Sequence, residues 1–254
     1  MNFAFDIDGT LSFDGRTIAL PITQALTYLI QAHHKVAFAS ARPIRDLLPI
    51  IPEFEHQPLI GGNGVMTRVS EKLSVLQPLP SAAVQQLKQL IEIHHLDYVM
   101  DGTWNYASQV STDNPILRQL DPQRLAQRQP LASLNDPVKV ILLNLAPVLR
   151  ARIKRLLITL DLVVIEHSGE GSLDITAQGI NKAHALANIG FEHYIAFGND
   201  ENDRTMLGCA RQAVWVTSKP ELAPVPQAII CPPDAESIAA LISNLSDRND
   251  CRVE

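Results

Sequence analysis

The stretch that decides the fold is Phe3-Ala4-Phe5-Asp6-Ile7-Asp8-Gly9-Thr10. An apolar run of strand length ends in two carboxylates, a glycine and a hydroxyl. Because side chains alternate along a strand, we expect Asp6 and Asp8 on one side and Ile7 turned toward the core. The apolar half is typical of a buried parallel strand, which is covered on both faces. Two acids at the end of such a strand predict a ligand-binding crevice at the carboxyl edge of an α/β sheet.

The same kind of ending recurs along the chain. The apolar segment 36–40 ends in Ser40, which is followed by Arg42 and the helix-starting Pro43. The segment 59–60 runs into a glycine-rich turn that contains Asn63, and the segment 194–197 runs into Gly198-Asn199-Asp200-Glu201-Asn202-Asp203. Lys182 stands at the start of the helix predicted before this last strand. Because the ends of parallel strands share one edge of a sheet, we expect these polar groups to converge.

The order of the elements predicts a core that a second domain interrupts. Residues 1–78 alternate strands and helices, and they include an Asp14-Gly15 hairpin signal that predicts a small flap at 11–18 over the two acids. Residues 79–178 carry a helix at 81–94, several short strands, a short helix near 122–129 and a turn at 169–171. The alternating pattern resumes at 179–254, with a closing helix to about residue 245. We therefore predict an α/β fold, with a doubly wound parallel-sheet (Rossmann-like) core and an inserted α+β cap domain.

Composition limits the class of protein. The chain has 254 residues, of which 46% are hydrophobic and 19% charged, so it can bury a core. The longest apolar runs, such as 138–145 with Lys139 inside it, are too short to span a bilayer, and we expect no signal peptide. Three widely spaced cysteines favour reduced thiols and a cytoplasmic location. The net charge of −6 argues against nucleic acid as a partner. The oligomeric state stays open.

Clustered carboxylates beside hydroxyls, a lysine and an arginine describe a divalent-metal site next to a phosphate site. Mg²⁺ takes a few carboxylates together with water and phosphate oxygens. Asp6 is ionised at neutral pH and can attack phosphorus without a base to activate it. Mg²⁺ and Lys182 would offset the repulsion between two anions. Asp8 can protonate the leaving alkoxide and later deprotonate the attacking water.

Four motifs resemble those of the haloacid dehalogenase (HAD) superfamily of phosphotransferases. They are Asp6-Ile7-Asp8-Gly9-Thr10, Ser40-Ala41-Arg42-Pro43, Lys182, and residues 198–203 with Arg204-Thr205-Met206-Leu207. The resemblance covers the whole chain, and the insertion between the second and third motifs is characteristic of the Cof-type branch with a class IIB cap. It implies a Mg²⁺-dependent phosphoric monoester hydrolase that acts on a small phosphorylated metabolite, such as a sugar phosphate, through an aspartyl-phosphate.

The resemblance also implies a role for each motif residue. Asp6 becomes the nucleophile and a metal ligand, and Asp8 the general acid/base and a ligand through its backbone carbonyl. The remaining assignments are phosphate binding for Thr10, Ser40, Arg42, Lys182 and Asn202, and metal binding for Asn199, Asp200 and Asp203. Asn63 is a candidate substrate contact on other grounds, because it follows a core strand near the linker to the cap. Asn199 stands where the family usually has a metal-binding aspartate, so it brings one less negative charge; Asp200 is the adjacent substitute.

Three other functions remain in view. A phosphomutase or another phosphotransferase would use the same aspartyl-phosphate but transfer it to an acceptor other than water. A ligand-binding relative with weakened catalysis is motivated by Asn199. A phosphate-responsive receiver domain also places acids and a lysine at strand ends, but it needs about half this length and no inserted domain.

Overall fold

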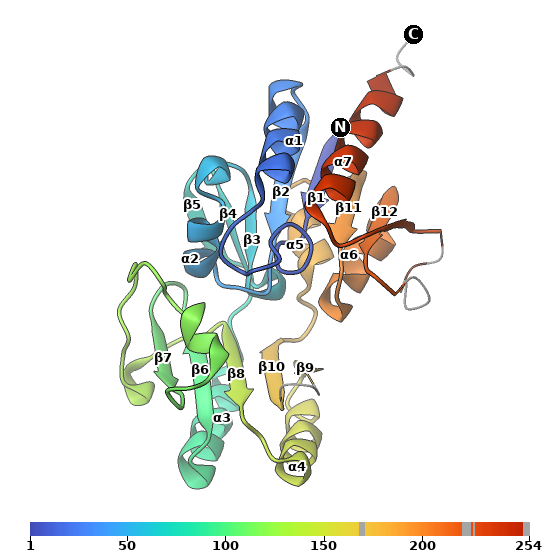
Figure 1. Cartoon of the computed structure of the whole chain (residues 1–254). Coiled ribbons are helices and arrows are strands. Elements are labelled where there is room, and N and C mark those ends of the chain that lie inside the picture. Colours follow the sequence, from blue (N-terminus) through green and yellow to red (C-terminus); the bar gives the residue numbers. More distant parts are fainter. Residues whose placement is uncertain (168–170, 220–224, 226, 251–254) are drawn as a thin grey trace.

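The structure is a computed structural model that describes residues 1–167, 171–219, 225 and 227–250. Its strands form two sheets, and the smaller one lies beyond the carboxyl ends of the central strands of the larger one (Figure 1). Two crossings of the chain connect them, one after β5 (Lys72–Val75) and one before α5 (Lys182–Asn188). The site predicted at the edge of the core sheet therefore faces the inserted region.

The larger sheet is mostly parallel. Besides β5 it contains β1 (Asn2–Phe5), β2 (Lys35–Ala39), β3 (Leu59–Gly61), β4 (Met66–Val69), β11 (Tyr194–Gly198), β12 (Gln212–Val216) and β13 (Ile229–Cys231). The order is β13-β12-β11-β1-β2-β3-β4-β5, and only β4 and β5 run antiparallel to their neighbours. The antiparallel pair β4–β5 extends the edge of this sheet. The central position of β1 places the two acids between β2 and β11.

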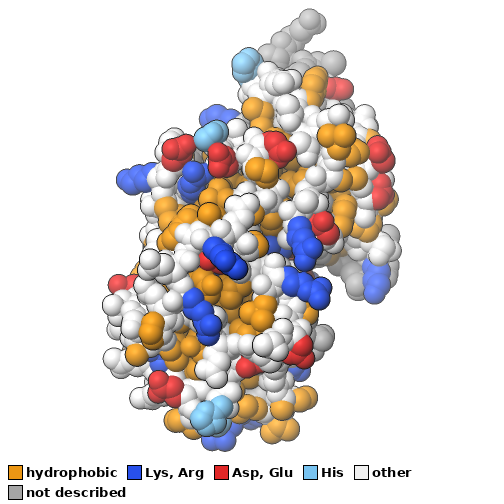
Figure 2. Space-filling view, turned by 60° about the vertical axis from the view of Figure 1, so that its left-hand side comes forward, with side chains coloured by type: hydrophobic (Ala, Val, Ile, Leu, Met, Phe, Trp, Pro, Cys, Tyr) orange, Lys and Arg blue, Asp and Glu red, His pale blue; other side chains and the backbone are white. Residues whose placement is uncertain are grey.

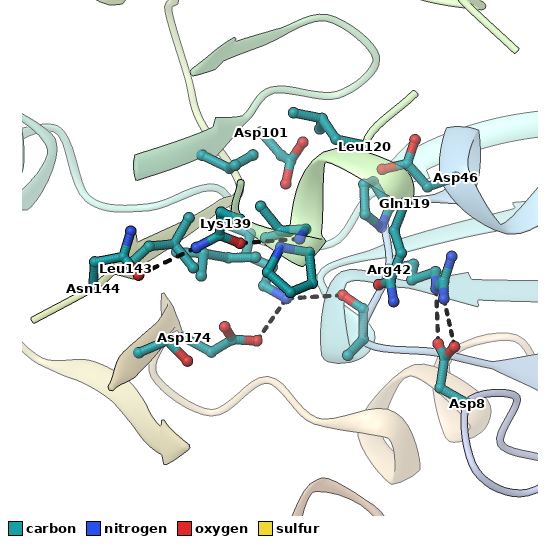
Figure 3. Close-up of a pocket in the computed structure, with 18 of the residues that line it drawn as sticks. Asp8, Arg42, Asp46, Asp101, Gln119, Leu120, Lys139, Leu143, Asn144 and Asp174 are labelled. Atoms are coloured by element: carbon teal, nitrogen blue, oxygen red, sulfur yellow. Dashed lines mark hydrogen bonds and ion pairs between the residues drawn. The ribbon is translucent and has the colours of Figure 1, made fainter. Parts of the chain in front are cut away.

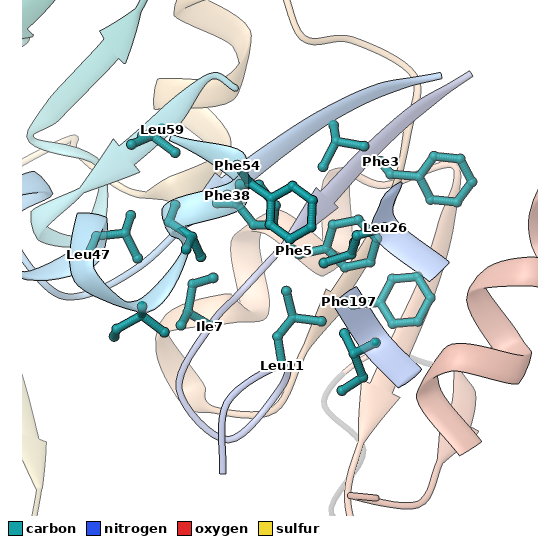
Figure 4. Packing of buried hydrophobic residues seen from close by; sticks show 14 of the residues in the cluster. Phe3, Phe5, Ile7, Leu11, Leu26, Phe38, Leu47, Phe54, Leu59 and Phe197 are labelled. Atoms are coloured by element: carbon teal, nitrogen blue, oxygen red, sulfur yellow. The ribbon is translucent and has the colours of Figure 1, made fainter. Parts of the chain in front are cut away.

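The two faces of this sheet carry side chains of different size. Phe3, Phe5 and Phe38 pack on the face covered by α1 (Leu20–Gln31), α2 (Ile44–Leu47) and α7 (Ala235–Asp250), as Figure 4 shows for part of the cluster. Alanines of the same strands lie on the opposite face under α5 and α6 (Arg204–Cys209). Alternation along the strands separates the two sets. Because both faces are buried, polar groups of the core strands are confined to their ends.

The smaller sheet is antiparallel and is covered by helices on one face only. It contains β6 (Asp97–Asp101), β7 (Tyr106–Gln109), β8 (Lys139–Leu143), β9 (Leu162–His167) and β10 (Ser172–Ala177), in the order β7-β6-β8-β10-β9. Apolar residues of these strands pack with α3 (Ser81–His94) and α4 (Pro147–Ile158). Within β6, Tyr98 and Met100 join that cluster, whereas Val99 and Asp101 line a cavity toward the core. One face of this sheet is therefore free to meet a ligand.

Short 3₁₀ turns complete the described elements: η1 (Leu48–Ile50), η2 (Pro52–Phe54), η3 (Gly62–Gly64), η4 (Pro115–Arg118), η5 (Leu131–Ser133) and η6 (Glu201–Asp203). None of the described helices has the length and apolar character needed to cross a membrane. The predicted α/β core with an inserted α+β region is confirmed by the topology. The boundaries 1–78, 79–178 and 179–254 stay predictions.

The predicted hairpin flap at 11–18 is wrong, because the segment forms no pair of strands. The Asp14 carboxylate instead accepts hydrogen bonds from the backbone N–H groups of Arg16 and Thr17, each at 2.8 Å. These bonds lower the pKa of Asp14 to about 2. The side chain thus takes donors that a hairpin ladder would need, and it folds the segment into a compact turn.

The predicted helix near 122–129 is also wrong. The carboxylate of Asp121 accepts hydrogen bonds from the backbone N–H groups of Leu125 and Ala126, at 2.7 and 3.1 Å, and holds the segment as a turn. The closing helix continues to residue 250, past the predicted end near 245, and buried Ser246 donates its hydroxyl to the carbonyl oxygen of Ser243. Two residues of the predicted turn at 169–171 lie outside the described residues.

Candidate active site

Three neighbouring strands of the core bring the polar groups together. The backbone N–H of Asp6 donates to the carbonyl of Phe197 at 2.9 Å, and that of Ser40 donates to the carbonyl of Ile60 at 2.9 Å. These bonds continue the sheet ladder one residue past β1 and β2. Asp6 and Ser40, the first polar residues of the first two motifs, are thereby held in register with the neighbouring strands. The predicted convergence of polar groups at this edge is present.

Lys182 joins the first and fourth motifs. It begins α5, whose N-cap Asn181 accepts a hydrogen bond from the backbone N–H of His184 at 2.9 Å. Its Nζ donates to Oδ1 of Asp6 and to Oδ1 of Asp203, at 2.6 Å each. The side chain of Lys182 is fully buried. The ammonium group therefore bridges two carboxylates at the end of the sheet.

Burial and charge act against each other in this trio. Burial disfavours the charged form of Lys182, but Asp203 and Asp6 outweigh that effect and raise its pKa. Burial and the nearby charge of Asp203 raise the pKa of Asp6 to about 7, against the opposing influence of Lys182. With both carboxylates ionised, the trio carries one net negative charge in a buried place, so a further positive group beside Asp6 is favoured.

The fourth motif is folded around Asp203. Oδ2 of Asp203 accepts hydrogen bonds from the backbone N–H groups of Asn199 and Asp200, at 2.9 and 3.1 Å. A Cβ at Gly198 would lie 2.7 Å from Cβ of Asp203, so this approach requires glycine. The Asp200 carboxylate accepts the backbone N–H of Glu201 at 2.7 Å and caps η6. Asp203 therefore holds the loop with one carboxylate oxygen and Lys182 with the other, and Asp200 caps the turn.

Asp8 and Arg42 form a second ion pair. Nε and Nη2 of Arg42 donate to the two carboxylate oxygens of Asp8 at 2.8 and 2.6 Å. The Asp8 side chain is 39% exposed, whereas Asp6 is 4% exposed. The turn at Gly15, with a φ of +67°, passes so close to Nη2 of Arg42 that a Cβ there would lie 2.8 Å from it. Arg42 therefore orients the more accessible carboxylate of the first motif.

The hydroxyl and amide groups predicted for the site lie along the same edge. Thr10 donates its hydroxyl to Oδ2 of Asp6 at 2.9 Å, and the Ser40 hydroxyl accepts the backbone N–H of Arg42 at 3.0 Å. The side-chain amide of Asn202 donates to that of Asn63 at 3.0 Å, and Asn63 is held with a φ of 60°. In the described part of the chain, the buried side-chain oxygen of Asn202 has no hydrogen-bond partner. The roles of these residues stay predictions.

One position between the motifs has the donor set of a cation site. Oδ1 of Asn199 accepts the hydroxyl of Thr10 at 3.0 Å, and it lies 3.0 Å from Oδ2 of Asp6 and from the carbonyl oxygen of Asp8. Oxygens of this kind suit Mg²⁺, which binds carboxylate, carbonyl and water ligands. Asp6, the carbonyl of Asp8 and Oδ1 of Asn199 fit that ion in chemistry. Within residues 1–167, 171–219, 225 and 227–250, however, no three His, Cys, Asp or Glu side chains gather as a metal-binding group.

A cavity of about 510 Å³ separates the core edge from the smaller sheet (Figure 3). Asp8, Arg42 and Asp200 line its core end, and Lys139 and Asp174 line its opposite end. Lys139 contacts both sides, since its Nζ lies 2.7 Å from a carboxylate oxygen of Asp174 and 3.0 Å from the carbonyl oxygen of Ala41 in the second motif. The cavity is therefore lined by residues of both the core and the smaller sheet.

The sequence as a whole matches one family. A family model described as haloacid dehalogenase-like hydrolase matches residues 3–239. The chain belongs to the haloacid dehalogenase-like hydrolases. No curated protein matches it.

Solved structures of HAD proteins share its fold over nearly the whole length. A haloacid dehalogenase-like hydrolase from Bacteroides thetaiotaomicron is 21% identical, with a TM-score of 0.80 and coverage of 96% of this chain and 98% of that one. One from B. subtilis is 18% identical, with a TM-score of 0.79 and coverage of 96% and 99%. A sugar phosphatase of HAD subclass IIB is 18% identical, with a TM-score of 0.78 and coverage of 96% and 98%. The predicted HAD core with an inserted cap is thereby confirmed.

Two polar groups between the HAD core and its cap were not found from sequence. Arg45 of α2 donates to Asp46 at 2.8 Å, to Asp101 of β6 at 2.7 Å and to the carbonyl of Trp104 at 2.7 Å. Burial disfavours its charge, but Asp46 and Asp101 outweigh burial and raise the pKa of Arg45. The other group is the pair of Lys139 with Asp174. A lysine inside the apolar run 138–145 is the one sequence signal that marks it.

Proposed function

We propose that this protein is a Mg²⁺-dependent phosphatase that hydrolyses a small phosphorylated metabolite, a sugar phosphate by class, through an aspartyl-phosphate on Asp6. The observation that carries the proposal is the Asp6 carboxylate. It is buried, held by Lys182 at 2.6 Å and Thr10 at 2.9 Å, and it lies at the sheet edge beside the more exposed Asp8. Membership of the HAD-like hydrolases supports the same chemistry.

Asp6 and Asp8 have different parts in the proposed reaction. An oxygen of Asp6 forms a bond to phosphorus while the bond from phosphorus to the ester oxygen breaks, and Asp8 gives its proton to the departing alkoxide. Water then attacks the aspartyl-phosphate, Asp8 takes the proton, and inorganic phosphate leaves. Lys182 stabilises the charge on Asp6 and on the transferring group. Because Asp6 is 4% exposed, the site must open before the ester reaches it.

Mg²⁺ bound to Asp6, to the carbonyl of Asp8 and to Oδ1 of Asn199 would neutralise charge on the phosphoryl oxygens. Every other contact with the phosphoryl group comes from the protein. The hydroxyls of Thr10 and Ser40 and the amide of Asn202 lie at the same edge and are proposed to donate to it. Their side chains stand at the ends of β1, β2 and β11, so a phosphoryl group at Asp6 is within the reach of all three strands.

The cavity supports a hydroxyl-rich leaving group. Its lining includes Asp101, Gln119, Asn144 and Asp174, whose carboxylates and amides can exchange hydrogen bonds with sugar hydroxyls. A volume of about 510 Å³ suits a small metabolite and excludes a protein or nucleic acid chain. Figure 2 shows more basic than acidic side chains across the waist of one face. Such a local field attracts a phosphate ester even though the net charge is −6.

Phosphate release from a panel of sugar phosphates, nucleotides, pyridoxal phosphate and p-nitrophenyl phosphate tests this function. We expect turnover in Mg²⁺ that is lost in EDTA and in Asp6→Asn. Lack of turnover by folded protein with every ester and metal would overturn it. Transfer to an added sugar in preference to water would instead identify a phosphomutase or another phosphotransferase.

A second candidate is a ligand-binding relative with weakened catalysis, and it is favoured by one observation. Asn199 places a neutral amide, not a carboxylate, 3.0 Å from Oδ2 of Asp6 and from the carbonyl oxygen of Asp8, so the proposed metal site has one less negative charge. Calorimetric titration with inorganic phosphate, in the same buffers as the ester panel, separates the two candidates. Tight phosphate binding without turnover would favour the binding protein.

A further inference from the structure

We propose that Asn63 is a positioning residue of the active site, which holds the side-chain amide of Asn202 in place to donate to the phosphoryl group. Asn63 acts on the reaction through Asn202 and does not touch the substrate. The inference rests on the proposed function, because that function assigns the phosphate contact to Asn202. It adds the glycine-rich turn after β3 to the parts on which the site depends.

The hydrogen bond between the two amides links distant strands of the core. Nδ2 of Asn202 donates to Oδ1 of Asn63 at 3.0 Å. Asn63 lies in η3, just after β3, and Asn202 lies in η6, just after β11. In the sheet these two strands are separated by β1 and β2, which lead into Asp6 and Ser40. The bond thus connects the two outer strands of the four whose ends form the site.

The side chain of Asn202 depends on Asn63 for its orientation. Among the described residues no other side chain or backbone group bonds to this amide, and its buried Oδ1 atom has no partner. Without the bond the amide can change its side-chain rotamer. Nδ2 carries two hydrogens, so one remains for a phosphoryl oxygen when the other is bonded to Asn63. The bond therefore restricts the amide without using up its capacity to donate.

Asn63 itself is held by two of the motifs. It is 5% exposed, and its backbone N–H donates to the carbonyl oxygen of Ser40 at 3.0 Å. The next residue, Gly64, passes so close to the carbonyl of Asn181 that a Cβ at this position would clash with it. Asn181 is the N-cap of the helix that begins with Lys182. The turn is thereby fixed against the second and third motifs, so its side chain can position a group of the fourth.

A direct substrate contact is the other role considered for Asn63, and its place argues against that role. Among the described residues, those that line the cavity include Asp8, Arg42 and Asp200 but not Asn63. Asn63 has a φ of 60°, in the left-handed region that glycine and asparagine adopt more readily than other residues. The backbone thus admits glycine or asparagine at this position, and of the two only asparagine supplies an acceptor for Asn202.

A double-mutant cycle tests this role. It compares the wild type with Asn63→Gly, which suits the left-handed backbone and removes the acceptor, with Asn202→Ala, and with the double variant. His95→Gly is the matched control, because His95 is also left-handed, with a φ of 49°, and lies at the exposed end of α3. The readouts are kcat and KM for the best ester of the panel and the Kd for inorganic phosphate by calorimetry. Melting temperature shows that each variant is folded.

We expect Asn63→Gly and Asn202→Ala each to lower kcat about tenfold, with a smaller change in KM, because a misplaced donor is lost mainly from the transition state. Each should also weaken phosphate binding. The double variant should be no worse than Asn202→Ala in either readout, since Asn63 has no effect once the amide is gone. His95→Gly should match the wild type. Asn202→Ser takes the place of Asn202→Ala in the cycle if the latter does not fold.

Wild-type kcat and phosphate affinity in Asn63→Gly would overturn the inference. It would also be overturned if Asn63→Gly caused the same loss in the presence and in the absence of the Asn202 amide, because Asn63 would then act on the ligand directly. Phosphate binding separates this inference from the proposed function. If the wild type binds phosphate but hydrolyses no ester, the phosphatase proposal fails and the calorimetric cycle still decides the role of Asn63. A wild type that neither hydrolyses an ester nor binds phosphate would overturn both.

Discussion

The two sheets of this molecule present their polar groups in different ways. The core sheet is buried on both faces, so its polar side chains stand at the ends of strands, as at Asp6, Ser40 and Asn199. The cap sheet is covered on one face only, and its polar groups project from the other face within the strands, at Lys139 and Asp174. The backbone hydrogen bonds of the whole sheet fix the position of each strand end. A residue on the open face of a strand can be substituted without moving the residues beside it.

Because of this difference, we expect the core edge to act on the chemical step and the cap face to act on substrate binding. At the core edge, the carboxylates of Asp6 and Asp203 share the buried ammonium group of Lys182, and Asp8 pairs with Arg42. On the cap face, Lys139 and Asp174 pair with each other and line the cavity. We therefore expect core substitutions to reduce kcat and cap substitutions to change KM.

The largest expected effect is that of Lys182→Met. Removing the ammonium leaves Asp6 and Asp203 facing each other with no buried cation, and it removes the charge that offsets phosphate repulsion. We expect kcat to fall by about 10³-fold or more and the free energy of unfolding to fall by about 3 kcal/mol. Steady-state kinetics and urea unfolding measure the two.

Lys72→Met, on the exposed end of β5, is the matched control and should change neither quantity. If Lys182→Met kept wild-type kcat, the core edge would not be the catalytic network. The comparison between the two sheets would then lose its basis.

The second prediction uses the raised pKa of Asp6, about 7 against a usual 3.8. Because the folded state binds a proton more tightly than the unfolded state, this group stabilises the fold below about pH 4, and the contribution is lost as pH rises to about 7. The expected loss is on the order of 4 kcal/mol, at about 1.4 kcal/mol for each pKa unit.

Urea unfolding in EDTA at several pH values measures this loss, and Asp6→Asn is the comparison. The pKa of buried Asp101 is also raised, by burial against the charge of Arg45, and its contribution is common to both proteins. The difference between the two stability curves therefore reports Asp6. A difference independent of pH between about 4 and 7 would contradict the prediction.

The sequence was sufficient to predict which polar groups meet at the ends of the core strands. The acids of Asp6-Ile7-Asp8 interrupt an apolar strand, and the parallel order of the core then brings Ser40 and Asn199 to the same edge. Two general rules give that prediction without further knowledge of the fold. Side chains alternate along a strand, and parallel strands end at the same edge of a sheet. What the sequence could not reveal at this edge was the position of the Asn199 amide among three oxygens, because that depends on how the loop folds around Asp203.

The sequence was not sufficient to predict which polar groups meet on the open face of the cap sheet. Lys139 lies opposite Asp101 because of the register between β6 and β8, and it meets Asp174 because β10 pairs on the other side of β8. A single lysine or aspartate in a short strand does not specify that register. Arg45 and Asp46, adjacent in the sequence, resemble an exposed helical pair until the cap covers them.

The joint between core and cap gives the third prediction. Arg45→Met leaves the carboxylates of Asp46 and Asp101 buried without their shared cation, whereas Asp101→Asn keeps a hydrogen-bonding group and removes one charge. We expect the free energy of unfolding to fall by about 3 kcal/mol for Arg45→Met and by about 1 kcal/mol for Asp101→Asn.

Urea unfolding measures both, with Arg204→Met as the control. The exposed pair of Arg204 with Glu201 should contribute less than about 1 kcal/mol. If Arg45→Met cost no more than Arg204→Met, the ion pair between core and cap would not hold the two sheets together.

The smallest expected effect belongs to the cap face. Lys139 lies in the cavity, and its Nζ contacts Asp174 at 2.7 Å and the carbonyl oxygen of Ala41 at 3.0 Å. Lys139→Met keeps the length of the side chain but removes the charge and the contacts with Asp174 and the carbonyl oxygen of Ala41. Because Lys139 lines the cavity and has a third N–H besides those toward Asp174 and Ala41, we expect it to donate to the leaving group in the ground state and the transition state alike. KM for the best sugar phosphate should then rise about tenfold, with kcat changed less than about twofold.

Lys154→Met, on α4 and paired with Glu166 away from the cavity, is the matched control and should leave KM unchanged. Melting temperature separates a binding effect from loss of the fold, since the Asp174 carboxylate loses its lysine partner in Lys139→Met. A fall in kcat as large as the rise in KM would mean that the cap face acts on the transition state as the core edge does. The division of tasks between strand ends and strand faces would then not hold.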